Sequence, residues 1–313
     1  MHDVLRAALK HGPNVGVLGL NCNSRTISCS TMLPIHKIIW HEFRAGERAI
    51  REPEPSEAMI DPAQIRAYVK AYEWGGPTSA LQLHHLRELS KMIRPGDTVL
   101  DLACGPGPLL LELAPLYPEC HFIGADLSQP MLDVLREQAD ERRLTNVEAI
   151  CDDIRTLHSL SGRKVDLVIT TSALHHLPDI DCLQATFARI NRLIDQDGGF
   201  YVFDFGLLRS PRTRQIMVDD IARKAPATTA LDYHYSLRAA FPIDQVIELA
   251  RSEIQRPFSA LSSSFVDFFY FLKSGPRGKP SANSLKKIAS LYRDFSADTK
   301  LEHMMLRAMR RNR

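Results

Sequence analysis

The stretch Val99-Leu100-Asp101-Leu102-Ala103-Cys104-Gly105-Pro106-Gly107 decides the fold of this chain. An apolar run typical of a buried β-strand enters a glycine-rich turn, and a helical pattern begins directly after it. Glycine has no Cβ to keep a ligand away, so backbone N–H groups of such a turn can approach a bound molecule closely. The turn lacks the third glycine of a dinucleotide-binding loop and the lysine of a phosphate-binding loop. Asp101 would repel a pyrophosphate and attract an ammonium group, so these residues predict a cationic ligand.

Downstream of this turn, short β runs alternate with amphipathic helical patterns up to Phe205, which is the signature of βαβ units and a parallel sheet. The five strands expected here are residues 98–103, 121–125, 147–151, 165–170 and 199–205, and the helices between them lie near 109–116, 130–143 and 180–193. Two further β runs, 254–261 and 265–272, lie so close together that only a hairpin can join them. The pattern therefore predicts an α/β fold that ends in an antiparallel strand.

Acidic residues end two more of the predicted strands. Asp126 ends the second strand, 25 residues after Asp101, where a carboxylate suits the two hydroxyls of a ribose. Asp152 and Asp153 end the third strand, and either could accept the exocyclic amine of adenine. An adenosine that carries an amino-acid tail fits all three strand ends.

The composition is that of an ordinary folded protein. The chain has 313 residues, of which 44% are hydrophobic and 24% charged, and this length can bury a full core. Its six cysteines form no CxxC pair and no Cys/His cluster, so we expect free thiols in the reducing cytoplasm and no bound metal. No run reaches the roughly 18 to 20 apolar residues that a membrane span needs, so no membrane partner is expected.

The stretch from Asp97 to Phe205 resembles a class I S-adenosylmethionine-dependent methyltransferase, of the broad group that acts mainly on small molecules. The match runs in order through VLDLACGPG, GADLSQPML, CDDI, DLVITTSALHHLPD and GGFYVFD. The resemblance implies a Rossmann-like three-layer sandwich around a seven-stranded, mostly parallel sheet in the order 3-2-1-4-5-7-6, with strand 7 antiparallel. It also implies S-adenosyl-L-methionine as the cofactor and in-line transfer of its methyl group to a small-molecule acceptor.

Four regions are expected along the chain. They are a poorly ordered leader at 1–31, an N-terminal helical lid or cap at 32–93, the S-adenosylmethionine-binding domain at 94–274 with a cap inserted at about 207–240, and a basic C-terminal helix at 275–313. Whether the leader belongs to the native protein is left open. Residues 273–313 hold eleven Lys and Arg against three Asp and Glu, which favours a solvated helix face over a docking surface for an acidic partner.

Carried over by position, the resemblance implies three groups of cofactor contacts. Asp101 would hold the methionine end together with the backbone of Ala103, Gly105 and Gly107, and Asp126 would hold the ribose. The remaining predicted cofactor contacts are Leu127, Met131, Asp152, Asp153, Ile154 and Thr171. Of the two adjacent acids, Asp152 is favoured as the partner of the adenine amine.

Candidates for the acceptor side follow the fourth strand and flank the sheet. His175 and His176 lie at the edge where open α/β sheets bind ligands, and either could remove a proton from the acceptor. The alternative is that they only open the next helix. The further candidates for the substrate pocket are the aromatic residues Tyr68, Tyr72, Trp74, Tyr233 and Tyr235, and Asp204, which ends the fifth strand and could instead cap a loop.

Two other functions remain open. RNA or protein could be the substrate because of the basic C-terminal segment, although no RNA-binding module is recognisable. The chain could also bind the cofactor without transferring its methyl group. A homodimer is an option if the C-terminal helix docks on a second subunit.

Overall fold

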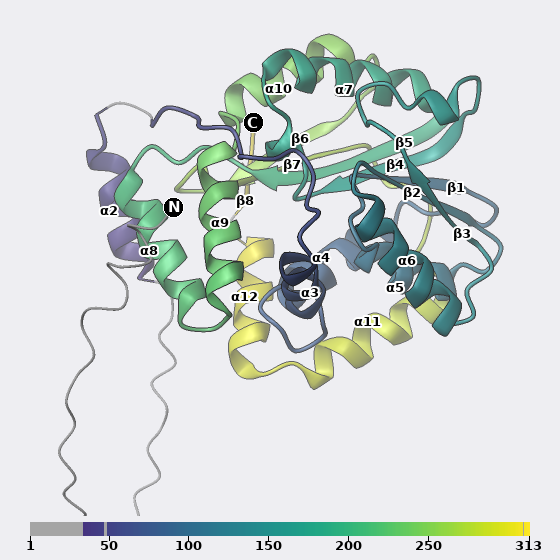
Figure 1. The fold of residues 1–313 in the computed structure, drawn as a ribbon, viewed down its shortest axis with the longest axis horizontal. Helices are drawn as coiled ribbons and strands as arrows, with labels where there is room; N and C mark the ends of the chain where they lie inside the picture. The colour runs from purple at the N-terminus through teal and green to yellow at the C-terminus, as the bar shows by residue number, and fades with distance from the viewer. Residues whose placement is uncertain (1–33, 47–48, 309) are drawn as a thin grey trace, which may run out of the picture. The chain divides into compact units, whose positions relative to one another are not determined.

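The computed structural model describes residues 34–46, 49–308 and 310–313, and the leader expected at 1–31 lies outside them. Its centre is an eight-stranded sheet in the order β3-β2-β1-β4-β5-β7-β6-β8 (Figure 1). The strands are β1 (Thr98–Leu102), β2 (His121–Asp126), β3 (Val147–Cys151), β4 (Val165–Thr171), β5 (Ile194–Phe205), β6 (Ser259–Ser263), β7 (Phe269–Lys273) and β8 (Arg310–Asn312). Strand β7 is antiparallel to both of its neighbours. The predicted fold class and the order of the first seven strands are confirmed.

Helices cover both faces of the sheet (Figure 1), because the side chains of each strand alternate between the faces. Leu100 and Leu102 pack into one core with α7 (Ile180–Leu193) and α10 (Ile243–Glu253). Val99, directly before Leu100, packs into the opposite core. The helices of that second face are α4 (Ser79–Leu89), α5 (Pro108–Leu113), α6 (Gln129–Glu141) and α11 (Ala282–Asp294). Burial on both faces explains why the strands read as continuous apolar runs.

A group of helices lies beside the edge at which β4 and β5 end. Helix α2 (Ile35–Arg44) packs on α8 (Pro211–Ala222), α8 packs on α9 (Ala227–Ala239), and α9 packs on α3 (Pro62–Ala71) (Figure 1). Helix α9 also contacts the short 3-10 helix η3 (Leu174–His176), which follows β4. Two further 3-10 helices are η1 (Ala114–Leu116) and η2 (His158–Leu160). The N-terminal segment and the insertion thus meet next to the histidine pair.

The C-terminal region differs from the single helix expected at 275–313. Helix α11 ends at Asp294, and α12 (Ala297–Ala308) begins after Ser296, whose Oγ accepts the N–H of Thr299 at 3.1 Å. The chain then pairs as β8 with β6, which adds an eighth strand to the expected seven. A serine N-cap interrupts the helical pattern here, and the apolar spacing on either side of it concealed the break.

The hairpin strands are shorter than the runs that predicted them. Helix α10 extends to Glu253, and the extended chain after it joins the sheet only at Ser259. Among the described residues, no helix is both long enough and apolar enough to cross a membrane.

Candidate functional site

The turn after β1 holds its backbone in an unusual shape. Gly105 and Gly107 have φ values of 54° and 66°, in the left-handed region that glycine adopts readily. Ala103 has a φ of 51°, although this conformation costs a residue with a Cβ about 1–2 kcal/mol. Ser172, after β4, has a φ of 55°. Strained backbone clusters at binding sites, and Ala103, Gly105 and Ser172 all line one pocket.

Asp126 ties this turn to the start of α6. Its Oδ2 accepts the N–H of Gly105 at 2.8 Å, and its Oδ1 accepts the N–H of Ser128 at 2.8 Å. Burial raises the pKa of Asp126, and the hydrogen bonds from Ser128 and Gly105 oppose that rise. The carboxylate therefore fixes two turns that border the pocket and lines the pocket itself.

Asp101 is buried on β1, two residues before the lining residue Ala103. Burial raises its pKa well above the ordinary value, and the negative charge of Asp126 adds to the rise. In the described part of the chain, no group donates a hydrogen bond to its carboxylate. An ionised carboxylate buried without a partner is costly, so this position favours a cation supplied by a ligand.

Most of the predicted cofactor residues line a pocket at the carboxyl ends of β1, β2 and β4. Those in the lining are Ala103, Gly105, Asp126, Leu127, Met131, Asp153 and Ile154. Asp101, Gly107 and Thr171 lie outside it, and Gly107 serves packing, since a Cβ there would lie 2.4 Å from Leu135 Cδ1.

The structure reverses the preference for Asp152 over Asp153. The carboxylate of Asp152 lies outside the pocket lining and accepts the N–H of Asp153 at 2.8 Å and that of Ser159 at 2.7 Å. Asp153 lines the pocket, and its carboxylate pairs with Arg155 Nε at 2.8 Å. Sequence reasoning could not separate two adjacent acids, because their difference depends on how the following loop folds back.

The N-terminal segment supplies part of the pocket lining that the sequence pattern did not indicate. Extended chain at Glu57–Met59 covers the pocket beside Leu127. The carbonyl of Met59 accepts a hydrogen bond from Ser128 Oγ, and Glu57 pairs with Arg155 at 3.2 Å. The other lining residues missed by the sequence analysis are Ser128, Arg155, Ser172, Ala173 and Leu177.

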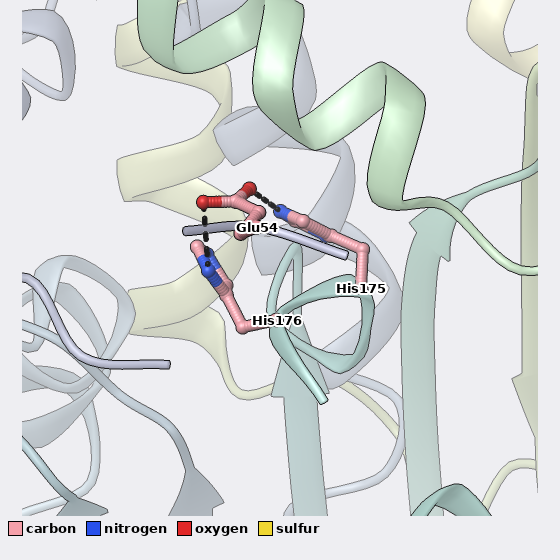
Figure 2. Close-up of side chains that lie close together, drawn as sticks. All are labelled: Glu54, His175 and His176. Atoms are coloured by element: carbon pink, nitrogen blue, oxygen red, sulfur yellow. Dashed lines mark ion pairs between the residues drawn. The ribbon is translucent and has the colours of Figure 1, made fainter. Parts of the chain in front are cut away.

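Next to this pocket, one carboxylate faces both predicted catalytic histidines (Figure 2). Glu54 Oε1 lies 3.6 Å from His175 Nε2, and Glu54 Oε2 lies 3.3 Å from His176 Nδ1. Burial tends to raise the pKa of Glu54, but the contacts with the histidines outweigh it and the pKa falls. Burial tends to lower the pKa of His176, but Glu54 outweighs it and the pKa rises. His176 also lines the pocket that most of the predicted cofactor residues line, so the group formed by Glu54, His175 and His176 adjoins this pocket.

Asp204 holds His175 rather than lining the pocket. Its Oδ1 lies 2.7 Å from His175 Nδ1, and its Oδ2 accepts the backbone N–H of His175 at 2.9 Å. Because a carboxylate only accepts, Nδ1 donates its N–H to Asp204, and Nε2 is the ring nitrogen that faces Glu54. Nε2 is buried without a hydrogen-bond partner. The two histidines lie in the 3-10 helix η3 and do not open the next helix, α7, as the alternative interpretation had it.

Arg51 fixes the loop that carries the histidines, a role that the sequence analysis missed. Its guanidinium donates to the carbonyls of His175 at 3.1 Å, Pro178 at 2.6 Å and Ala239 at 2.7 Å. The same group lies 3.8 Å from the centre of the Phe241 ring. One side chain therefore joins the N-terminal segment, the η3 loop and the end of α9.

The predicted aromatic pocket is only partly present. Tyr68 lines the cofactor-type pocket and stacks on Tyr72 with ring centres 4.6 Å apart. Trp74 instead packs near Phe295, with ring centres 6.2 Å apart, in the core under the sheet. The two remaining candidates also lie outside the lining: Tyr233 packs in a small core beside Phe205, and Tyr235 neighbours His234.

Ion pairs with the rest of the domain occupy several cations of the basic C-terminal segment. The buried Arg277 pairs with Asp97, with Nη1 and Oδ2 2.6 Å apart, and Lys287 pairs with Glu112 at 3.0 Å. The other cations paired in this way are Lys273 with Glu88, and Arg311 and Arg313 with Asp267. These contacts hold the segment on the domain, and of the five cations only Lys287 lies on a helix, α11.

Residues 99–198 match the family model described as a methyltransferase domain. The chain carries a class I methyltransferase domain. Domains of this class use S-adenosylmethionine, and Asp101, Asp126, Asp152 and Asp153 fall within the matched range.

Two curated relatives share this methyltransferase domain. The chain is 31% identical over 97 residues to (S)-tetrahydroprotoberberine N-methyltransferase from Eschscholzia californica, which is 31% of this chain and 27% of that protein. It is 38% identical over 120 residues to tRNA (guanine-N(7)-)-methyltransferase from Rubrobacter xylanophilus, which is 37% of this chain and 50% of that protein. The chain thus spans between a quarter and a half of the length of these relatives.

Among solved structures, the plantazolicin methyltransferase BamL, in complex with a triazolic desmethylPZN analog and SAH, has a similar fold. The TM-score is 0.51 at 16% identity, and the alignment covers 76% of this chain and 87% of that one. At this identity the similarity concerns the fold of the methyltransferase domain alone.

Proposed function

We propose that this chain binds S-adenosylmethionine and transfers its methyl group to a small-molecule acceptor. The observation that carries the proposal is the buried carboxylate of Asp101, which has no hydrogen-bond donor among the described residues and stands two residues before Ala103, which lines the pocket. The ammonium of a methionine tail would supply the missing counter-charge.

The other residues of the pocket fit the rest of this cofactor. Asp126 offers carboxylate oxygens for ribose hydroxyls, and Leu127 and Ile154 offer apolar surface for an adenine ring. Asp153 is the acid placed to accept the adenine amine. S-adenosylmethionine bound in this pocket supplies a methyl group on a sulfonium, which already has a good leaving group. The chain must therefore mainly orient the acceptor and exclude water.

His175 and His176 stay the proposed catalytic residues, now together with Glu54. His176 and Ser172 line the pocket, and the Tyr68 ring lies against Gly105. An acceptor held between these groups would contact the imidazole of His176 directly. His175 lies behind it, and Arg51 and Asp204 act as positioning residues for this loop.

Segments from outside the sheet support a small molecule over a macromolecule as the acceptor. Residues 57–59 line the pocket, and helices α3 and α9 pack on each other. We propose residues 32–93 and 207–240 as the two parts of this lid, around the domain at 94–274. The internal ion pairs of the basic C-terminal segment leave fewer cations for RNA. The cytoplasmic location and the homodimer stay predictions.

The test is transfer of label from methyl-labelled S-adenosylmethionine into cell extract, followed by separation into small-molecule, RNA and protein fractions. We expect label in the small-molecule fraction with the wild-type chain and strongly reduced label with Asp101→Asn. Asp166→Asn is a matched control, because this acid lies at the opposite end of the neighbouring strand and binds the N–H of Thr98 at 2.8 Å. Label in RNA or protein would overturn the small-molecule acceptor.

A further inference from the structure

We propose that Glu54, His175 and His176 bind a divalent transition-metal ion. The three side chains offer a carboxylate oxygen and two imidazole nitrogens, and these ligand atoms all lie within 4.8 Å of one another. In the described part of the chain no other three such residues lie so close together. Mixed imidazole and carboxylate ligands suit zinc and its neighbours in the first transition row.

The distances from Glu54 to the two histidines match the separations between ligand atoms around one metal ion. Ligand atoms held 2.0–2.1 Å from a tetrahedral zinc ion lie about 3.3–3.4 Å from one another. Glu54 lies 3.6 Å from His175 Nε2 and 3.3 Å from His176 Nδ1. Well-formed hydrogen bonds between these groups would measure about 2.7–3.2 Å. Figure 2 shows each imidazole turned toward one of the two carboxylate oxygens of Glu54.

His175 has the arrangement of a metal ligand. Its Nδ1 faces Asp204 at 2.7 Å, which leaves Nε2 as the ring nitrogen directed at Glu54. Nε2 is buried and has no hydrogen-bond partner. A metal ion between Nε2 and the Glu54 oxygen would satisfy both atoms. A carboxylate that holds the far nitrogen of a ligating imidazole is a common second partner in metal sites.

The carboxylates of Glu54, Asp204 and Asp232 stand around the histidines, against the one guanidinium of Arg51 that interacts with Glu54, and a dication would balance this excess of negative charge. Asp204 is buried behind His175, and Asp232 on α9 lies near enough to interact electrostatically with Glu54 and both histidines. Ser236 Oγ donates to Glu54 Oε1 at 3.1 Å, which orients the carboxylate. Because His176 also lines the pocket, an ion here would face the acceptor side. Its use in methyl transfer rests on the proposed function, whereas the metal site itself does not.

The experiment measures metal content directly. The full chain, with its affinity tag removed, is stripped with a chelator, dialysed against zinc and analysed by elemental mass spectrometry, in parallel with Glu54→Gln and His176→Asn. We expect one zinc ion per wild-type chain and a loss of affinity of at least about tenfold in each variant. His121→Gln is the matched control, because it removes another histidine–glutamate pair, at 2.9 Å, outside the site; it should bind zinc like the wild type.

A second readout keeps the proposal testable if a variant folds poorly. Cobalt(II) added to the stripped wild-type chain should develop visible absorption bands, and zinc should displace it. No zinc retained by the wild type, or equal retention by Glu54→Gln with a native circular dichroism spectrum, would overturn the metal site. Methyl transfer that persists unchanged in the stripped chain would show that the histidines act without an ion, and it would leave the proposed function standing.

Discussion

Replacement of Asp101 by asparagine should change two measurable quantities, the affinity for S-adenosylmethionine and the pH dependence of folding stability. The substitution removes a charge that has no partner within the described chain and that the cofactor ammonium would meet. Hydrogen bonds to charged groups contribute about 1.5–3 kcal/mol, so affinity for S-adenosylmethionine should fall about 10- to 150-fold. Isothermal calorimetry on the purified chain measures this directly, with Asp166→Asn as the control that should leave affinity unchanged.

The same variant should also change how the stability of the cofactor-free chain depends on pH. The pKa of Asp101 is raised by burial, so the folded chain binds a proton that the unfolded chain has already released. Between about pH 4, where an unfolded aspartate titrates, and the higher pKa of the folded state, stability should therefore fall as pH rises. The difference in unfolding free energy between wild type and Asp101→Asn should show this slope in urea titrations. If this difference in unfolding free energy does not change with pH, and if the variant binds S-adenosylmethionine as tightly as the wild type, then the cofactor ammonium does not pair with Asp101.

Three further predictions concern packing around the site. Gly107→Ala, with its φ of 66° and a Cβ pressed against α6, should destabilise the chain by about 2–4 kcal/mol. Gly96 has a φ of 81°, and no atom lies within 4 Å of a Cβ placed there, so Gly96→Ala should lower the unfolding free energy by only about 1–2 kcal/mol in the same urea titration. Equal losses in the two variants would contradict the packing argument. Tyr68→Ala should weaken binding of S-adenosylhomocysteine about 2- to 12-fold by calorimetry, whereas Trp74→Ala should lower the melting temperature and leave binding unchanged. Arg51→Lys should lower stability by about 1–3 kcal/mol, because an ammonium cannot reach all the carbonyls that the guanidinium joins, those of His175, Leu177, Pro178 and Ala239. An unchanged urea midpoint would contradict this role of Arg51.

The cofactor side of the site could be predicted because its information is local. Strand, glycine turn and acid lie within nine residues from Val99 to Gly107, and the same strand-end rule places Asp126. The sequence could not show which of Asp152 and Asp153 lines the pocket, because this depends on the hydrogen bond from Ser159 further along the loop.

The acceptor side depends on contacts between distant segments, and sequence patterns carry little of it. Glu54 and Arg51 lie in extended chain without periodicity, more than a hundred residues before the histidines that they contact. Trp74 was placed wrongly, because the turn after α3 carries it away from Tyr68 and toward Phe295. An aromatic residue at the end of a helix is positioned by the turn that follows, not by helical spacing.

The measurement that tests the central claim most directly is a pair of calorimetric titrations of the wild-type chain, one with S-adenosylmethionine and one with NAD⁺. Both ligands carry adenosine, but one has a cationic amino-acid tail and the other a pyrophosphate. The buried Asp101 under the Gly105 turn predicts saturable binding of S-adenosylmethionine at one site per chain and no detectable binding of NAD⁺. Tighter binding of NAD⁺ than of S-adenosylmethionine would contradict the account.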